Sequence, residues 1–431
     1  MSVLQRPPSS TVVKILGAVC FFYFIIVSIT HTADNGFSIW TSESNIKGHV
    51  LINDVYNSTL GFQKIFVISL PERTDHRDAI ILAAAASGIE IEFVDGVMGA
   101  SVLEKVIPPP ASPQRTALGN IGSWRAHMNA IAEIIKQNLT TALILEDDAD
   151  WDIRLRTQLH SFALAAHALT QPLASSNPHN PTYADPTFPT PPDSSTTIPN
   201  PLTINSLPQT HAPTRSPYGD NWDLLWLGHC GAAFPNPHVP PTYGFSTYQP
   251  RGRVLHQNDP TVPEWLHCKF LSADDPPNAT YTPHTRVTHH VMGNICSLAY
   301  ATTQESARRL LYTMTTAFTA PFDIMLREYC EGPHSLSPKN HLELRTCLTM
   351  QPQLFNHHRK AGKMSFESDI SNHGDGVREV ASTGMVRWSV RINLERIFGL
   401  VGLGVGENKA GEGWVDQWPD GEAGRTMEGF D

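Results

Sequence analysis

The chain has 431 residues, which allows one large domain or two ordinary ones. Hydrophobic residues make up 41% and charged residues 17%, so the chain can bury a sizeable core and is not disordered as a whole. A formal net charge of −10 argues against a nucleic-acid binder, because contacts to phosphates need clustered Lys and Arg.

An apolar run at the start of the chain indicates a membrane anchor. Residues 15–29 read ILGAVCFFYFIIVSI, and with the residues just before them they approach the roughly 17 needed to span a bilayer. Arg6 and Lys14 precede the run, which favours a cytoplasmic N-terminus. We therefore expect a cytoplasmic tail at 1–12, a signal anchor at 13–30 and a translocated body. A cleaved signal peptide is the alternative, although no small-x-small cleavage site is obvious after the run.

Two further features agree with a lumenal body in the endoplasmic reticulum or Golgi. N-glycosylation triplets begin at Asn57, Asn138 and Asn278. Five cysteines follow the apolar run, so at most two disulfides can form and one thiol is left over. Burial as small apolar residues is the alternative for several of these cysteines, which are Cys230, Cys268, Cys296, Cys330 and Cys347.

Regular structure is expected to begin after a short polar stem at 31–61. Residues 65–70 (IFVISL) have the β-branched and aromatic composition of a buried strand. An Ala-rich helix at 76–87 follows, with Gly88 as its C-terminal cap, and then a second strand at 89–94. A strand–helix–strand order of this kind predicts a parallel sheet covered by helices, the α/β class.

The same alternation continues along the chain. Further elements are expected as a helix at 121–137, strands at 142–145, 223–227 and 295–301, and a helix behind a capping box of Thr302 and Glu305.

Several segments lack a clear period. Residues 172–217 are dense in Pro, Ser, Thr and Asn, which predicts a disordered surface insertion. Residues 236–290 are expected to form long loops. Apolar residues alternate with polar ones over 386–394, which predicts one more half-exposed strand, and the chain after Gly399 reads as a flexible tail.

An acidic motif is the sharpest functional signal. The strand at 142–145 ends in Glu146, Asp147 and Asp148. In open α/β sheets ligands bind at the carboxyl ends of strands, and a hard divalent ion bridging to a pyrophosphate would neutralise such a cluster. The alternative is an acidic turn that is merely solvated.

Two arginines form a second signal, at the end of the first strand. Arg73 and Arg77 open the helix there, and their planar donors suit a phosphate or a nucleotide base. A helix start with ordinary surface charges is the alternative.

In combination, four ordered motifs resemble glycosyltransferase family 25, which includes bacterial lipopolysaccharide galactosyltransferases and procollagen hydroxylysine galactosyltransferases. The motifs are IFVISLPERTDHR at 65–77, LGNIGSWRAH at 118–127, ALILEDDA at 142–149 and DLLWLG at 223–228. The resemblance extends over roughly 62–372, which we expect to be a glycosyltransferase domain, followed by a C-terminal extension at 373–431.

The resemblance implies a GT-A-type, Rossmann-like fold and an inverting transfer of a hexose, most often galactose. The donor would be a UDP-sugar such as UDP-galactose, the acceptor a hydroxyl on a protein or glycan, and the cofactor a divalent metal such as manganese. With the anchor, this describes a single-pass type II membrane protein with a lumenal catalytic domain.

Site residues carried over from the resemblance fall into two groups. Arg73, Arg77, Glu146 and His127 would bind the donor, and Asp147 and Asp148 would hold the metal, with Glu146 beside them. Gly122 also falls on a family position, whereas Ser123 and Ala126 stand where the family usually has Cys and Ser.

The base that deprotonates the acceptor is assigned first to Asp323, with Asp369 and Glu305 as weaker candidates. A helix N-cap is the alternative for Asp323. A C-terminal histidine often completes the metal shell in this fold class, and His357, His358 and His373 are the candidates.

Two other functional hypotheses remain open on the sequence. The donor could instead be UDP-glucose or UDP-N-acetylglucosamine. The chain could also be a catalytically silent lumenal protein that binds glycans or partner enzymes through the same fold.

Overall fold

The computed structural model describes residues 51–189, 197–236, 249–268, 277–332, 345–370, 374–399 and 414–421. The expected anchor at 13–30 and His373 lie outside these ranges. Within these ranges the chain contains no helix of the length and apolar character that a membrane span requires.

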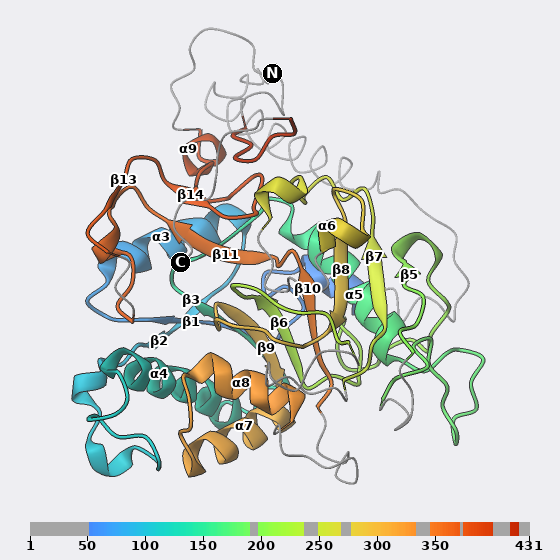
Figure 1. Ribbon diagram of the computed structural model, residues 1–431, viewed down its shortest axis with the longest axis horizontal. Helices are drawn as coiled ribbons and strands as arrows, with labels where there is room; N and C mark the ends of the chain where they lie inside the picture. Colours follow the sequence, from blue (N-terminus) through green and yellow to red (C-terminus); the bar gives the residue numbers. More distant parts are fainter. Residues whose placement is uncertain are drawn as a thin grey trace, which may run out of the picture. The chain divides into compact units, whose positions relative to one another are not determined.

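A large mixed sheet forms the centre of the described chain (Figure 1). Its first strands, β1 (Lys64–Ser69), β2 (Glu92–Asp95) and β3 (Thr141–Glu146), are parallel to one another. The sheet continues through the antiparallel strand β9 (Ala299–Thr303) to β6 (Leu224–Gly228), β10 (Cys347–Gln351), β8 (Arg286–His290), β7 (Arg253–His256) and β5 (Leu202–Thr203). The α/β class and the Rossmann-like start of the sheet are thus confirmed.

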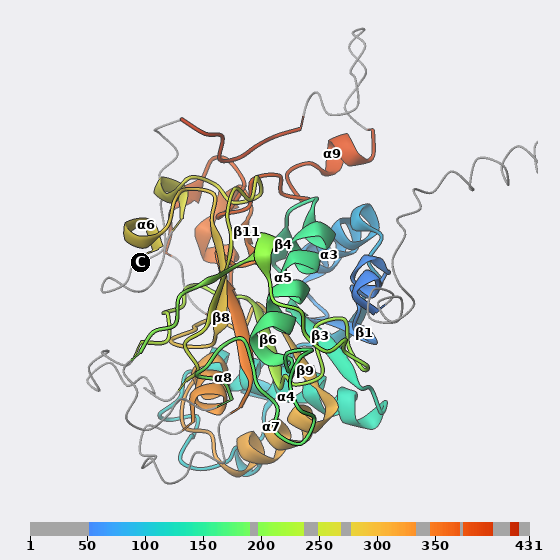
Figure 2. The same cartoon turned by 90° about the vertical axis from the view of Figure 1, so that its right-hand side faces the viewer.

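Helices cover both faces of this sheet. Ile65 and Val67 of β1 pack in one apolar core with α3 (Thr74–Ser87) and α5 (Leu155–Thr170). Phe66 and Ile68, which point the other way, pack with α4 (Leu118–Lys136), α7 (Gln304–Thr316) and α8 (Phe322–Glu331). Alternate residues of a strand face opposite sides, so one strand supplies both cores. Figure 2 shows the two helical layers on either side of the strands.

A small group of strands lies where β3 ends. Strand β11 (Phe355–Arg359) pairs with β4 (Ala149–Trp151) and with β14 (Ser382–Thr383). The register places His357 opposite Ala149, so a residue from late in the chain lies beside the acidic motif.

The remaining elements are short. They are α6 (Pro277–Thr280), α9 (Leu394–Ile397), the strand pair β12 (Gly362–Lys363) and β13 (Val377–Arg378), and 3-10 turns at Asp54–Tyr56, Gly99–Ser101, Glu104–Val106, Ile204–Ser206, Trp265–His267 and Met364–Phe366.

The first strand–helix–strand unit agrees with its prediction, including Gly88 as a left-handed cap with φ of 60°. The capping box of Thr302 and Glu305 is wrong by one position. Thr303 caps α7, because its hydroxyl accepts a hydrogen bond from the backbone N–H of Ser306 (3.2 Å).

The segment 172–217 was expected to be disordered, and its described parts, 172–189 and 197–217, correct that expectation. Asp185 is 2% exposed, and its carboxylate accepts hydrogen bonds from the backbone N–H groups of Thr187 (2.8 Å) and Gly252 (2.9 Å). Phe188 is buried and stacks on His290. A buried polar centre, which no apolar period reveals, orders this segment.

The boundaries of the packed unit also differ from expectation. Ile52, Val55 and Leu60 are buried in the core beside α5, so the last part of the expected stem packs with the domain. At the other end of the chain, Gln417 and Trp418 are buried too, and the indole of Trp418 donates to the Thr383 carbonyl (3.0 Å).

Two further expectations need correction. Residues 386–394 form turns that run into α9 instead of a half-exposed strand, because the polar residue Ser389 is as buried as its apolar neighbours. The expected loops at 236–290 contain β7 and β8, strands whose buried arginines and histidines hide an apolar pattern.

Candidate active site

A cavity of about 230 Å³ opens at the carboxyl ends of the three parallel strands. Residues at the end of β1, residues 96–100 after β2 and the first half of α4 form its walls, and the loop 367–370 closes one side. Gly122 is required here, because a Cβ at this position would lie 2.3 Å from the carbonyl oxygen of Val97. The apolar lining of the cavity consists of Ile68, Leu70, Val97, Met98, Ala100, Leu118, Ala126 and Ile370.

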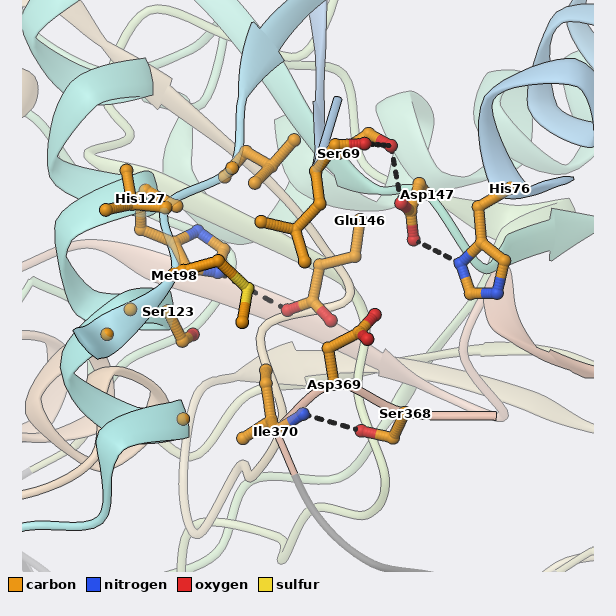
Figure 3. Close-up of a pocket in the computed structure, with 18 of the residues that line it drawn as sticks. Ser69, His76, Met98, Ser123, His127, Glu146, Asp147, Ser368, Asp369 and Ile370 are labelled. Carbon is orange, nitrogen blue, oxygen red and sulfur yellow. Dashed lines mark hydrogen bonds and ion pairs between the residues drawn. The ribbon is translucent and has the colours of Figure 1, made fainter. Parts of the chain in front are cut away.

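Glu146 reaches the cavity from the end of β3, beside Met98 and His127 (Figure 3). The Ser297 hydroxyl donates to its Oε1 (2.8 Å), and His127 Nε2 lies 3.4 Å from the same oxygen. The ring of His127 is 2% exposed and stacks on Phe322, with Nδ1 3.1 Å from the Tyr300 hydroxyl. Glu146 is therefore oriented by buried neighbours.

The side-chain and carbonyl oxygens of Asp147 contact other protein groups. Its carboxylate accepts from the Ser69 hydroxyl (2.6 Å) and contacts His76 Nδ1 (2.8 Å), as Figure 3 shows. Its carbonyl oxygen accepts from Arg391 (2.7 Å). This arrangement ties the end of β1 to the start of α3.

Asp148, Glu146 and His357 form a group that could hold a metal. One ligand atom from each residue lies within 4.8 Å of the other two. Oδ1 of Asp148 is buried and has no hydrogen-bond partner among the described residues. Carboxylates suit a hard divalent ion such as Mn²⁺, which also accepts an imidazole nitrogen, so the donor set fits the expected metal. Asp147, which the sequence assigned to the metal, is not in this group.

Of the other histidine candidates, His358 turns away. Its Nδ1 lies 3.0 Å from the Thr383 hydroxyl and 3.7 Å from the buried carboxylate of Asp150. The sequence offered both adjacent histidines as candidates and did not separate them.

The two predicted donor-site arginines contact protein groups and are not among the described residues that line the cavity. Arg73 pairs with Asp75 and Asp369 and donates to the Phe366 carbonyl (3.3 Å). It thereby fastens the 366–369 loop over α3. The hydrogen bond from Arg73, with a second from Lys360, holds the pKa of Asp75 below its usual range.

Arg77 stabilises the turn after β1. Its guanidinium donates to the carbonyls of Ser69 (2.8 Å) and Leu70 (3.2 Å), and it lies over the ring of Phe93. Both arginines thus shape the cavity from outside.

The three candidates for the base differ in position. Asp323 lies at the start of α8, where its oxygens accept from the backbone N–H groups of Cys296 (2.8 Å) and Ile324 (2.9 Å). Asp369 lines the cavity, and Glu305 pairs with Arg309 on an exposed face of α7.

A smaller cavity of about 170 Å³ borders the other side of the acidic motif. Arg391 lines it with a buried Nε that has no hydrogen-bond partner in the described part of the chain. Burial lowers the pKa of this guanidinium. The remaining lining residues are Asp75, His76, Ala79, Asp148, His358, Lys360, Glu367 and Leu394.

Two disulfides and one unpaired cysteine agree with the count made from the sequence. The bridges are Cys230–Cys296 and Cys330–Cys347. Burial raises the pKa of the remaining thiol, Cys268, to about 12.

Sequence reasoning missed Ser69, His76, Ser297 and Arg391 as site residues. Ser69 and His76 lie within the motif at 65–77, whose arginines attracted attention instead. Ser297 contacts Glu146, and Arg391 contacts Asp147. In each pair the two residues are more than 150 positions apart in the sequence, and no local sequence pattern predicts such a contact.

A carboxylate-lined cavity at the carboxyl edge of a Rossmann-like sheet lies where α/β proteins with open sheets bind their ligands. Residues 62–182 match the model of glycosyltransferase family 25, described as "LPS biosynthesis protein". This segment is similar to that family, as the sequence resemblance predicted.

Curated relatives include proteins named as galactosyltransferases and a protein named as inactive. Procollagen galactosyltransferase 2 of Mus musculus is 27% identical over 115 residues, which cover 24% of this chain and 18% of that protein. Procollagen galactosyltransferase 1-B of Xenopus laevis is 30% identical over 121 residues, 25% of this chain and 20% of that protein. Inactive glycosyltransferase 25 family member 3 of Homo sapiens is 27% identical over 113 residues, 24% of this chain and 19% of that protein. The matches thus span about a fifth of these relatives.

Proposed function

We propose that this chain is a glycosyltransferase that moves a hexose, galactose in the first instance, from a UDP-sugar to a hydroxyl of a protein or glycan. The family match supports the transferase class. The observation that carries the proposal is the convergence of Glu146, Asp148 and His357, because the two carboxylates of this group line a cavity with apolar walls. Such walls suit a flat nucleotide base, and the carboxylates suit a metal-bound diphosphate.

Each group in the site would have a distinct task. A divalent ion held by Glu146, Asp148 and His357, manganese in our proposal, would offset the charge on the departing diphosphate. Ser297 and His127 keep Glu146 in place, and Asp147 holds the end of β1 against α3. The loop 367–370 limits access of water to the cavity.

Two carboxylates are candidates for the base that would deprotonate the acceptor hydroxyl. Asp323 was the first candidate, but both its oxygens already accept hydrogen bonds from backbone N–H groups. Those contacts favour a positioning role for Asp323. Asp369, which lines the cavity and pairs with Arg73, is the next candidate.

A catalytically silent protein is the second hypothesis, because some relatives are named inactive. The unpartnered buried oxygen of Asp148 argues for activity, since leaving a buried acceptor unsatisfied costs about 1–3 kcal/mol unless a ligand compensates.

We also propose a lumenal location behind the N-terminal anchor. Two disulfides agree with an oxidising compartment. Asn57 and Asn138, which begin two of the glycosylation triplets, are exposed.

The experiment is release of UDP from a panel of UDP-sugars by the full chain, with and without Mn²⁺. We expect Mn²⁺-dependent release from one donor, which names the sugar. The Glu146→Gln, Asp148→Asn double variant should lose it, whereas Glu133→Gln, a half-buried carboxylate on α4 that does not line the cavity, should keep it. A folded chain that releases UDP from no donor would support the silent hypothesis.

A further inference from the structure

Cys296 has an unusual backbone conformation close to the candidate metal group. Its φ of 63° is uncommon for a residue with a side chain. Three contacts hold it there. The disulfide joins it to Cys230, Asp323 accepts from its N–H (2.8 Å), and the Trp226 indole donates to its carbonyl (2.9 Å). A conformation this restricted persists only where the surroundings enforce it.

The residue after Cys296 connects this strained point to one candidate ligand. Ser297 is 6% exposed, and its hydroxyl donates to Glu146 Oε1 (2.8 Å). The position of that hydroxyl depends on the backbone at Cys296, which Asp323 and the disulfide fix. Glu146 is therefore oriented through a chain of contacts that starts at α8.

The other half of the disulfide contacts a second candidate ligand. Cys230 Sγ lies 3.9 Å from His357 Nδ1. A disulfide sulfur carries no hydrogen, so in this weak hydrogen bond Nδ1–H is the donor. That tautomer leaves the lone pair of Nε2 free, and Nε2 is the atom that faces Asp148 Oδ2 at 4.0 Å. Metal-binding histidines commonly have their tautomer fixed by a partner of the second nitrogen.

We propose that the Cys230–Cys296 disulfide and Asp323 are positioning groups that set Glu146 and His357 for the metal, so that opening the bridge weakens metal binding in a folded chain. The inference rests on the proposed metal site. It assigns to Asp323 a role that depends on accepting a hydrogen bond and not on taking up a proton.

The second disulfide provides a matched control. Cys330–Cys347 joins the last turn of α8 to the start of β10, and both of its cysteines are fully buried. Replacing either pair by Ala removes one bridge and leaves no new thiol to pair with Cys268. Loss of stability should be common to both variants, and loss of metal binding should be confined to one.

The experiment measures Mn²⁺ binding by the full chain with calorimetry, and ligation by electron spin-echo spectroscopy, which detects an imidazole nitrogen on Mn²⁺. The Cys230→Ala, Cys296→Ala variant should bind Mn²⁺ about tenfold or more weakly. It should also lose the nitrogen signal, as His357→Ala does. The Cys330→Ala, Cys347→Ala variant should keep both.

Asp323 is tested by a conservative pair of variants. Asp323→Asn retains a side-chain oxygen for the Cys296 N–H and should keep Mn²⁺ binding within about threefold, whereas Asp323→Ala should weaken it about tenfold. Equal Mn²⁺ affinity in the two disulfide variants, with the nitrogen signal intact, would overturn the inference alone. No Mn²⁺ binding by the unmodified chain would contradict the metal site itself and the inference with it.

Discussion

At the scale of single residues, the three consecutive carboxylates after β3 have different surroundings. Glu146 is held by Ser297 at the cavity, Asp147 contacts Ser69 and His76, and one buried oxygen of Asp148 has no hydrogen-bond partner in the part of the chain that the structure describes. The sequence predicted an acidic site here but not which side chain faces outward. Side-chain direction in a tight turn depends on the neighbours, and these come from three distant segments.

This difference predicts unequal effects of two similar substitutions. Asp148→Asn removes a candidate ligand and should weaken Mn²⁺ binding by about tenfold or more. Asp147→Asn preserves hydrogen-bonding capacity toward Ser69 and should change the affinity by less than about threefold, since Asp147 is not in the candidate group. Calorimetric titration with Mn²⁺ measures both. A larger loss for Asp147→Asn would show that our ligand assignment is wrong.

At the scale of elements, the loop that includes Met364–Phe366 is attached to α3 through Arg73. The Arg73 guanidinium pairs with Asp369 and donates to the Phe366 carbonyl, and Lys360 pairs with Asp75 at the other end of the loop (2.6 Å). Asp369 and Ile370 then lie against the cavity. Closure of the cavity by the loop 367–370 therefore depends on contacts with the N-terminus of α3.

We expect Arg73→Ala and Asp369→Asn to act as a coupled pair. Each should speed amide hydrogen exchange in residues 364–370 and weaken UDP binding by roughly three- to tenfold, and the double variant should be no weaker than the single ones. Lys64→Ala, which breaks a half-buried pair with Glu92 on the sheet, is the control and should leave exchange in this loop unchanged. Additive effects would exclude the proposed attachment.

The Pro-rich segment at 172–217 is the basis of a second prediction at the scale of elements. Asp185 accepts hydrogen bonds from Thr187, both N–H and hydroxyl, and from Gly252. Asp185→Ala leaves these buried donors unpaired and should lower the free energy of unfolding by about 3 kcal/mol. Urea unfolding measures the change. A loss below about 0.5 kcal/mol would mean that this segment does not contribute to the packed unit.

How far the elements could be predicted depends on local pattern. Apolar strands such as 65–70 and the Ala-rich helix with Gly88 were predicted closely, because their sequences alone favour those structures. Strand β8 reads RVTHH and is wholly buried, so its polar residues conceal it. Its pairing with β10 and β7 is fixed only by the assembled sheet.

At the scale of the whole molecule, residues late in the chain complete the acidic site. Asp150 is fully buried and accepts hydrogen bonds from the hydroxyls of Thr383 (2.6 Å) and Ser389. Trp418 in turn packs over Thr383. The segment after residue 373 thus supports β4, the strand that directly follows the acidic motif, through contacts that no motif could reveal.

Global stability should depend on pH through buried histidines. Burial lowers the pKa of His229 and of His290 to about 4, against 6.5 when unfolded. Between these pH values the unfolded chain binds more protons, so the free energy of unfolding should fall as the pH falls from about 6.5 to 4. Urea unfolding at pH 7 and pH 5 tests this.

A substitution at one of these histidines provides the control. His290→Phe retains the stacking on Phe188 and removes one titrating group, so the decline between pH 7 and pH 5 should become shallower. Equal unfolding free energies at the two pH values in the unmodified chain would contradict the assignment of these histidines as neutral when buried.

We propose above all that Glu146, Asp148 and His357 hold a metal ion, and that this ion binds a nucleotide in the same site. Calorimetric titration of the full chain with UDP, with and without Mn²⁺, tests it most directly. We predict one UDP bound per chain in the presence of Mn²⁺, binding at least about tenfold weaker without it, and loss of this dependence in Glu146→Gln, Asp148→Asn. UDP binding of equal strength without the metal, or no UDP binding by the folded chain, would contradict the claim.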